Sequence, residues 1–184
     1  MPIREALAEA GLFVSEQLPP RAVRWVKPAN IHLTLRFLGD TDLATLPQIG
    51  ESLDQVASKF GPIDLRLGQL GCFPNARKPR VIWIGVNGDV RRLEKLHGDV
   101  EKQLQPLGWP PEGRRFHPHL TIGRAKDSRR VVAARLPWGE QLRTDSFTVA
   151  NISLIESELQ PTGAVYTTRH ESVLAEPPEA QSAQ

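Results

Sequence analysis

The chain of 184 residues is long enough to bury a core without disulfides, and its single cysteine, Cys72, excludes an intrachain disulfide and a cysteine-based zinc site. No apolar run approaches the ~18 residues of a membrane span, and the N-terminus lacks the apolar core of a signal peptide, so we expect a soluble, cytoplasmic protein. The net charge of +2 argues against tight binding along an extended nucleic acid, but 17 of the 23 basic residues are arginine, whose guanidinium suits phosphate oxygens.

Apolar residues spaced three and four apart predict an amphipathic helix over residues 3–18, which Pro19 and Pro20 end. A short strand is expected over 21–26 and a stronger one over 30–37. A second helix fits 41–60.

The rest of the chain also consists of alternating strands and helices. Strands are predicted over 63–70 and 80–86, separated by a loop that holds Gly71, Pro74, Asn75 and Pro79. A third helix covers 89–107 and a short one covers 129–135, and strands follow over 146–155 and 165–174. We expect the tail from 176 to 184 to be disordered.

One tripeptide occurs twice, as His32-Leu33-Thr34 and His119-Leu120-Thr121. Each copy lies in a run that alternates polar and apolar residues, which is typical of a strand with one buried face. This alternation places each histidine on the same face as the threonine two residues later. In the first copy Leu33, Leu35 and Phe37 are expected to face the core.

The order of elements repeats after each histidine. Each tripeptide is followed by a helix and then by two strands that are joined by a loop with glycine and proline. We interpret this as a degenerate internal duplication, and we expect residues 1–175 to form a single domain of two lobes. The predicted fold class is therefore α+β, with two lobes of mainly antiparallel sheet that flank a central groove and carry their helices outside.

The two repeated histidines suggest acid–base chemistry. Two imidazoles that titrate near neutrality can divide the work, one accepting a proton and the other donating it. Thr34 and Thr121 would lie within reach of a phosphate oxygen.

A competing hypothesis is a metal site, because His117 and His119 share a strand face and could ligate zinc or copper. No carboxylate or thiol stands at a suggestive spacing nearby. His97 is expected to be solvated among charged neighbours, and His170 has no partner that the sequence identifies. Neither a metal nor another cofactor is therefore expected.

Four segments resemble the two-histidine (2H) phosphoesterase superfamily, and within it the RNA 2′,3′-cyclic phosphodiesterases, also called 2′-5′ RNA ligases. Residues 25–39 (WVKPANIHLTLRFLG) are similar to the first motif region of that family, and residues 116–124 (FHPHLTIGR) to the second. Residues 79–86 resemble its middle strand and 163–166 its last. The resemblance extends over roughly residues 2–174.

The resemblance implies metal-independent hydrolysis of a terminal 2′,3′-cyclic phosphate on RNA to a 2′-phosphate. It makes His32 the proton donor to the departing 3′ oxygen and His119 the base that activates water. Thr34 and Thr121 would hold the non-bridging oxygens. Arg124 corresponds to an arginine that follows the second motif, but it alternates to the face opposite His119 unless a bulge intervenes, which Gly123 could permit.

The chain departs from the family pattern at its start. The family has a strand before its first helix, whereas Pro2 to Leu7 match the family's first helix itself. Leu12 to Pro19 look superficially like that strand, but placing it there would leave no room for the helix before Trp25. We expect reduced stability or weaker substrate binding if the strand is missing.

Three functions remain open from the sequence. Cyclic phosphate hydrolysis on RNA ends is the first, 2′-5′ RNA ligation is the reverse of the same bond change, and a non-catalytic RNA-end-binding protein is the third. The expected partners are RNA ends or oligonucleotides with a 2′,3′-cyclic phosphate, without a membrane, and the protein is expected to be a monomer.

Overall fold

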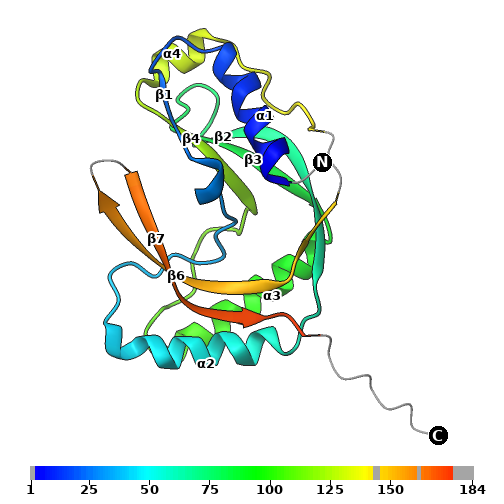
Figure 1. Ribbon diagram of the computed structural model, residues 1–184, viewed down its shortest axis with the longest axis vertical. Coiled ribbons are helices and arrows are strands. Elements are labelled where there is room, and N and C mark those ends of the chain that lie inside the picture. The colour runs from blue at the N-terminus through cyan, green and yellow to red at the C-terminus, as the bar shows by residue number, and fades with distance from the viewer. Residues whose placement is uncertain (1–2, 143–145, 161–162, 176–184) are drawn as a thin grey trace, which may run out of the picture. The chain divides into compact units, whose positions relative to one another are not determined.

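The computed structural model describes residues 3–142, 146–160 and 163–175. The predicted disorder of residues 176–184 lies outside these ranges. The chain divides into two compact units (Figure 1), of which the first comprises Met1–Thr34, Asp64–Val90 and His117–Phe147, and the second comprises Leu35–Ile63, Arg91–Phe116 and Thr148–Gln184.

The first unit is built on an antiparallel sheet in which β1 pairs with β4, β4 with β3 and β3 with β2. Its elements are α1 (Ile3–Glu16), β1 (Val23–Trp25), the 3-10 helix η1 (Pro28–Asn30), β2 (Ile63–Phe73), β3 (Val81–Gly88), β4 (His119–Ala125) and α4 (Ser128–Ala133). The strand order is β1-β4-β3-β2, with the short β5 (Phe147–Val149) beyond β2. β4, which begins with a histidine, therefore lies inside the sheet.

The core of the first unit forms because β3 and β4 place branched apolar side chains on one face. Ile82, Ile84, Leu120 and Ile122 are each at most 5% exposed. Helix α1 packs near β4 and buries Ala6, Leu7, Ala10 and Val14, which are the inward positions of its amphipathic pattern. This buried layer fixes the sheet, so that the opposite face of β4 presents its polar side chains in a defined geometry.

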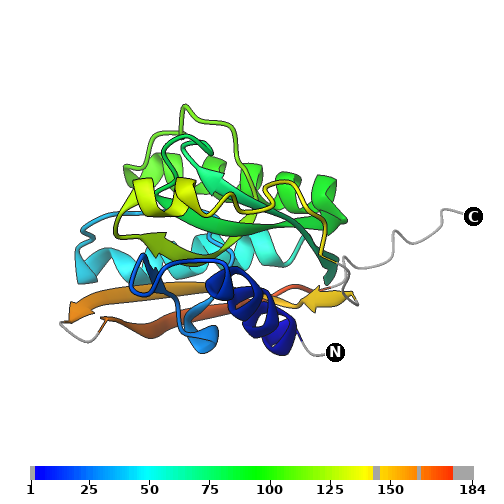
Figure 2. The ribbon, with the colours of Figure 1, turned by 90° about the horizontal axis from the view of Figure 1, so that it is seen from above.

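The second unit pairs two helices with a long antiparallel hairpin. Its elements are η2 (Leu43–Thr45), α2 (Leu46–Ala57), α3 (Val90–Leu104), η3 (Gln105–Leu107), β6 (Asn151–Gln160) and β7 (Gly163–Val173). β6 and β7 run side by side as a curled two-stranded sheet (Figure 2), and α2 packs against both strands. Asp54 on α2 accepts hydrogen bonds from Ser172 Oγ (2.6 Å) and His170 Nε2 (2.9 Å) on β7, which fasten the helix to the hairpin.

The α+β fold with antiparallel sheets confirms the predicted fold class, and most predicted elements agree with the structure to within a few residues. The strand predicted over 30–37 is wrong, because only Leu33 makes a β-bridge there and Phe37 is 74% exposed. The alternation fails after Thr34, where Arg36 turns inward to Glu101 at 2.9 Å. None of the helices in the described part of the chain has the length and apolar character that a bilayer crossing requires.

Candidate active site

The two repeated tripeptides lie side by side in the first unit. Leu33 and Leu120 form an isolated antiparallel β-bridge, in which Leu120 is buried and Leu33 is half-buried. In an antiparallel pair the register runs in opposite directions from such a bridge, so His32 lies opposite Thr121 and Thr34 lies opposite His119. Each histidine is therefore a cross-strand neighbour of the threonine from the other motif.

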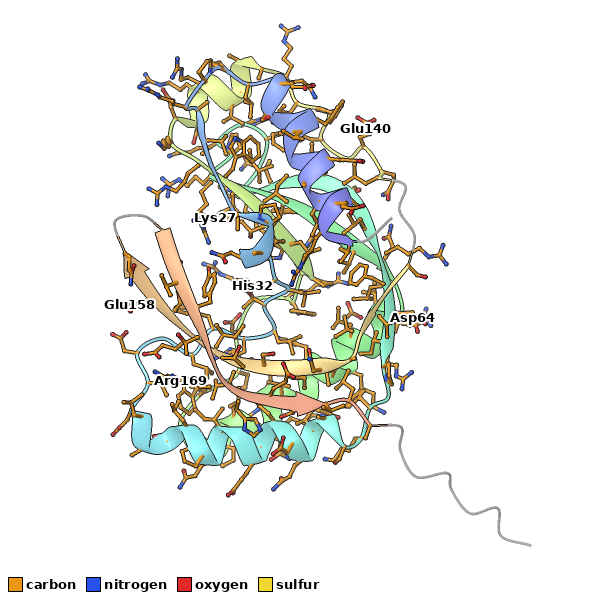
Figure 3. All side chains as sticks on the ribbon, viewed as in Figure 1. Lys27, His32, Asp64, Glu140, Glu158 and Arg169 are labelled. Carbon is orange, nitrogen blue, oxygen red and sulfur yellow. The ribbon has the colours of Figure 1, made fainter. Side chains whose placement is uncertain are left out.

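Both imidazoles are held in the same way. His32 Nδ1 lies 2.8 Å from the carbonyl oxygen of Asn30, and His119 Nδ1 lies 2.6 Å from the carbonyl oxygen of His117. A carbonyl oxygen only accepts, so Nδ1 carries a hydrogen and donates it in both rings. The nitrogen that exchanges a proton with a ligand is then Nε2 in each case. Figure 3 shows His32 just after the short η1 turn that Lys27 precedes.

An aromatic cluster surrounds His119. Its ring centroid lies 5.0 Å from that of Phe73 and 6.0 Å from that of Trp83, and the ring of His117 lies 4.7 Å from Trp83. Trp83 is the cross-strand partner of Thr121 on β4 and also of Gly71 on β2. A Cβ at residue 71 would lie 2.2 Å from Trp83 Cη2, so only glycine leaves room for the indole.

The cluster changes the proton affinity of His119. Burial, to which these rings contribute, lowers the pKa of His119 below its ordinary value of 6.5. The hydrogen bond to the carbonyl of His117 raises this pKa, and the nearby charges of His117 and Arg124 lower it further. His119 is therefore predominantly neutral at pH 7, which is the state that accepts a proton.

A bulge in β4 brings Arg124 to the same face as His119. Trp83 pairs with Thr121, but the next residue back along β3, Ile82, pairs with Gly123, so β4 has one extra residue at this point. Ile122 and Gly123 are both buried, and Arg124, which follows them, is exposed. The bulge reverses the alternation that separates Arg124 from His119 in a regular strand.

Two further histidines have partners that the sequence does not reveal. The prediction that His97 is solvated is wrong, because its ring stacks on Phe116 at 4.0 Å and its side chain is 14% exposed. His170, for which the sequence identifies no partner, pairs with Asp54. Among the described residues, no group of three or more His, Cys, Asp or Glu side chains could hold a metal ion, so the pair of His117 and the second motif histidine has no third ligand there.

The sequence alone identifies the histidines and threonines but not the aromatic cluster. Phe73, Trp83 and Gly71 come together only through the pairing of β2 with β3, and no local pattern marks that register. The one local indication in the sequence is that Phe73 stands between Gly71 and Pro74 in the predicted loop.

Comparisons with known proteins identify the family of the chain. The sequence model of the 2′-5′ RNA ligase superfamily matches residues 7–161. An RNA 2′,3′-cyclic phosphodiesterase of Aeropyrum pernix is 32% identical over 171 residues, which cover 92% of this chain and 91% of the relative. One of Aquifex aeolicus is 35% identical over 155 residues, which cover 82% and 81%.

Solved structures are similar over nearly the whole chain. A Thermus thermophilus protein has a TM-score of 0.78 at 29% identity, covering 95% of this chain and 92% of its own. E. coli LigT, solved with 3′-AMP, has a TM-score of 0.72 at 26% identity and covers 94% and 93%. The sequence match over most of the chain and these shared folds show that the chain belongs to the 2′-5′ RNA ligase superfamily of 2H phosphoesterases.

Proposed function

We propose that the protein hydrolyses the 2′,3′-cyclic phosphate at RNA ends to a 2′-phosphomonoester without a metal ion. The observation that carries this proposal is the cross-strand arrangement of the two motifs, in which each Nδ1-anchored imidazole lies opposite a threonine hydroxyl. The phosphodiesterases of Aeropyrum pernix and Aquifex aeolicus support it, because they share sequence with this chain over most of its length.

The two histidines have different environments, and the difference supports one assignment of roles. His119 is the general base, because burial lowers its pKa and Nε2 then has a lone pair to accept a proton from water. His32 is the general acid that protonates the departing 3′ oxygen. The P–O3′ bond breaks as the P–O bond to water forms, and the phosphate remains on the 2′ oxygen.

The remaining polar side chains stabilise the charge that develops on phosphorus oxygens. Thr34 and Thr121 donate hydrogen bonds to the non-bridging oxygens, because each lies opposite the histidine of the other motif across the bridge. Arg124 shares that face through the bulge and adds a guanidinium, which is suited to phosphate. Fixed donors of this kind need little reorganisation during the reaction.

The pseudo-symmetric pair also favours a second function, 2′-5′ RNA ligation. The same acid–base pair that opens a 2′,3′-cyclic phosphate with water can open it with an RNA hydroxyl in place of water. A 5′-hydroxyl that attacks phosphorus then forms a 2′-5′ phosphodiester, and the 3′ oxygen leaves as before.

Alanine variants of the two histidines test the proposal. We expect His119→Ala and His32→Ala each to reduce kcat by ~10²- to 10⁴-fold on a cyclic-phosphate oligoribonucleotide, with little change in affinity. His170→Asn, in the second unit, is the matched control and keeps wild-type turnover. If both alanine variants turn over normally, the assignment is wrong, and if wild type only binds the ligand, the protein is an RNA-end-binding protein.

A further inference from the structure

Three segments of the first unit hold a large share of the basic residues. Residues 20–30, 74–80 and 124–130 together contain ten Lys or Arg and a single acid, Asp127. The rest of the chain contains the other 13 basic and 20 acidic residues, so a net charge of +2 conceals about +9 on these segments and −7 elsewhere. Such asymmetry indicates a surface for a polyanion. The ten residues are Arg21, Arg24, Lys27, Arg77, Lys78, Arg80, Arg124, Lys126, Arg129 and Arg130.

The three segments converge at one end of the sheet. Arg24 on β1 is the Cα partner of Arg124 on β4, so their side chains share a face. The backbone N–H of Ala125 donates to the carbonyl oxygen of Arg80 at 2.9 Å, which joins the β2–β3 loop to the end of β4. Ser128 Oγ donates to the carbonyl oxygen of Pro79 at 2.7 Å and holds the same loop against the start of α4.

The loop that carries Arg77 and Lys78 has a defined shape. Asn75 Oδ1 accepts from the backbone N–H groups of both residues, at 3.0 and 3.2 Å. The N–H of Arg80 donates to the carbonyl oxygen of Phe73 at 2.7 Å and closes the loop at its base. Binding a ligand here would cost little ordering of the backbone.

We propose that this basic end of the sheet, defined by the ten Lys and Arg residues of the three segments, binds the phosphate backbone of single-stranded RNA on the 5′ side of the reacting nucleotide. This inference rests on the proposed function, which it extends from a terminal nucleotide to a polynucleotide. Arg124 shares the face of His119 through the bulge in β4, so it joins the site of reaction to the basic end. The β2–β3 loop that carries Arg77 and Lys78 contacts β4 directly after it, at Ala125. The backbone of a bound strand can therefore reach the basic end from the site of reaction.

The chemistry of the same face favours RNA over other polyanions. The half-buried ring of Phe73 lies at the basic end, because its cross-strand partner Val81 is also the partner of Arg124, and aromatic side chains beside basic ones are typical of single-strand binding. A membrane surface is a poorer match, because none of the exposed large apolar side chains of the described residues belongs to these three segments.

The test compares two substrates in one enzyme. We would measure kcat/KM on a 2′,3′-cyclic mononucleotide and on an oligoribonucleotide that ends in the same group, for wild type and for Arg77→Gln/Lys78→Gln. We expect the ratio of oligonucleotide to mononucleotide kcat/KM to fall about tenfold in the variant. The dependence of log KM on log salt for the oligonucleotide should flatten by about 0.7 for each phosphate that the variant no longer neutralises.

A matched control removes the same charge elsewhere. Arg91→Gln/Arg92→Gln changes two exposed arginines on α3 in the second unit and should leave the ratio at its wild-type value. An unchanged ratio in the Arg77/Lys78 variant, or an equal fall in the control, would overturn the inference.

Failure of the proposed function is recognised separately. If wild type turns over neither substrate, the affinity of each protein for a 3′-phosphorylated oligoribonucleotide replaces kcat/KM as the readout. The inference then stands if the Arg77/Lys78 variant alone binds more weakly. It is overturned if the Arg77/Lys78 variant binds the oligoribonucleotide as wild type does and loses binding to anionic phosphatidylserine vesicles instead.

Discussion

Leu33 and Leu120 pair across two antiparallel segments, and this one bridge sets the relation between the two histidine motifs. Because the register is antiparallel, it exchanges partners between the motifs, so that His32 lies opposite Thr121 and Thr34 lies opposite His119. Two copies of one tripeptide thereby form a single site with an approximate two-fold relation. The surroundings break this symmetry, since aromatic rings of β2 and β3 pack beside the second histidine.

The approximate symmetry predicts that both threonines contribute to catalysis. Thr34→Val and Thr121→Val keep the side-chain shape and remove only the hydroxyl, so we expect each to lower kcat/KM by roughly 10- to 10³-fold. Circular dichroism and thermal unfolding would show that both variants fold. A variant with wild-type kcat/KM would show that its hydroxyl does not contact the reacting phosphate.

The aromatic cluster predicts a change in the pH profile of activity. Phe73→Ala opens the surroundings of His119 to water and should raise its pKa toward 6.5. Because the base must be neutral, kcat/KM falls as the pH drops through the pKa of His119. The acid limb of the profile should therefore move to higher pH in the variant, while the activity at high pH changes much less.

The matched control for this profile is Phe37→Ala, which removes a phenyl ring that is 74% exposed in the second unit. Its acid limb should coincide with that of wild type. An acid limb that stays in place in Phe73→Ala would mean that the phenyl ring does not tune His119.

The contact between Gly71 and Trp83 predicts a strong effect of one methyl group. Gly71→Ala places a Cβ 2.2 Å from Trp83 Cη2, so the indole must move, and overpacking of this kind costs ~1–3 kcal/mol. Gly85→Ala is the matched control, because its Cβ would lie 3.5 Å from the same ring. Urea unfolding of both variants measures the difference, and equal stabilities would contradict the packing described.

The sequence predicts elements whose pattern is local. The buried side of α1 and the alternation of β4 can be predicted from the spacing of apolar residues alone, because a helix buries every third or fourth residue and a strand every second one. Alternation cannot show where pairing stops, so it predicts a strand that continues after Thr34, although Arg36 turns inward to Glu101. The net charge likewise does not reveal the basic end of the sheet, because its three segments are far apart in the sequence and come together only in the fold.

Contacts between distant residues account for the other differences. The bond between His170 and Asp54 joins residues 116 positions apart, and the stacking of His97 on Phe116 joins a helix to a loop. The bulge in β4 that carries Arg124 to the face of the second motif depends on the register with β3. Each of these needs the pairing of elements to be known first.

The buried ion pair of Arg36 and Glu101 predicts a large and asymmetric effect on stability. Both side chains are about 10% exposed, and Arg36 also donates to the carbonyl oxygen of Pro110 at 2.7 Å. Arg36→Met takes the guanidinium from the buried Glu101 carboxylate, which keeps only the N–H of Glu112 at 2.8 Å and His97 Nε2 at 4.0 Å. This variant should cost about 3–5 kcal/mol, whereas Arg36→Met with Glu101→Leu should cost less. The free energy of unfolding in urea separates these cases.

The exposed pair of Lys102 and Asp99 on α3 serves as control. Their side chains are 74% and 22% exposed, and Lys102→Met should cost no more than about 1 kcal/mol. If the single Arg36 variant is as stable as the Lys102 variant, the buried pair does not hold this part of the second unit together.

The most direct measurement identifies the product formed from an oligoribonucleotide that ends in a 2′,3′-cyclic phosphate, incubated with purified protein in the presence of a chelator. We predict a 2′-phosphomonoester end in wild type and none in His119→Ala, because water attacks phosphorus and the 3′ oxygen departs. A 3′-phosphate product, or activity that the chelator abolishes, would contradict the proposed chemistry.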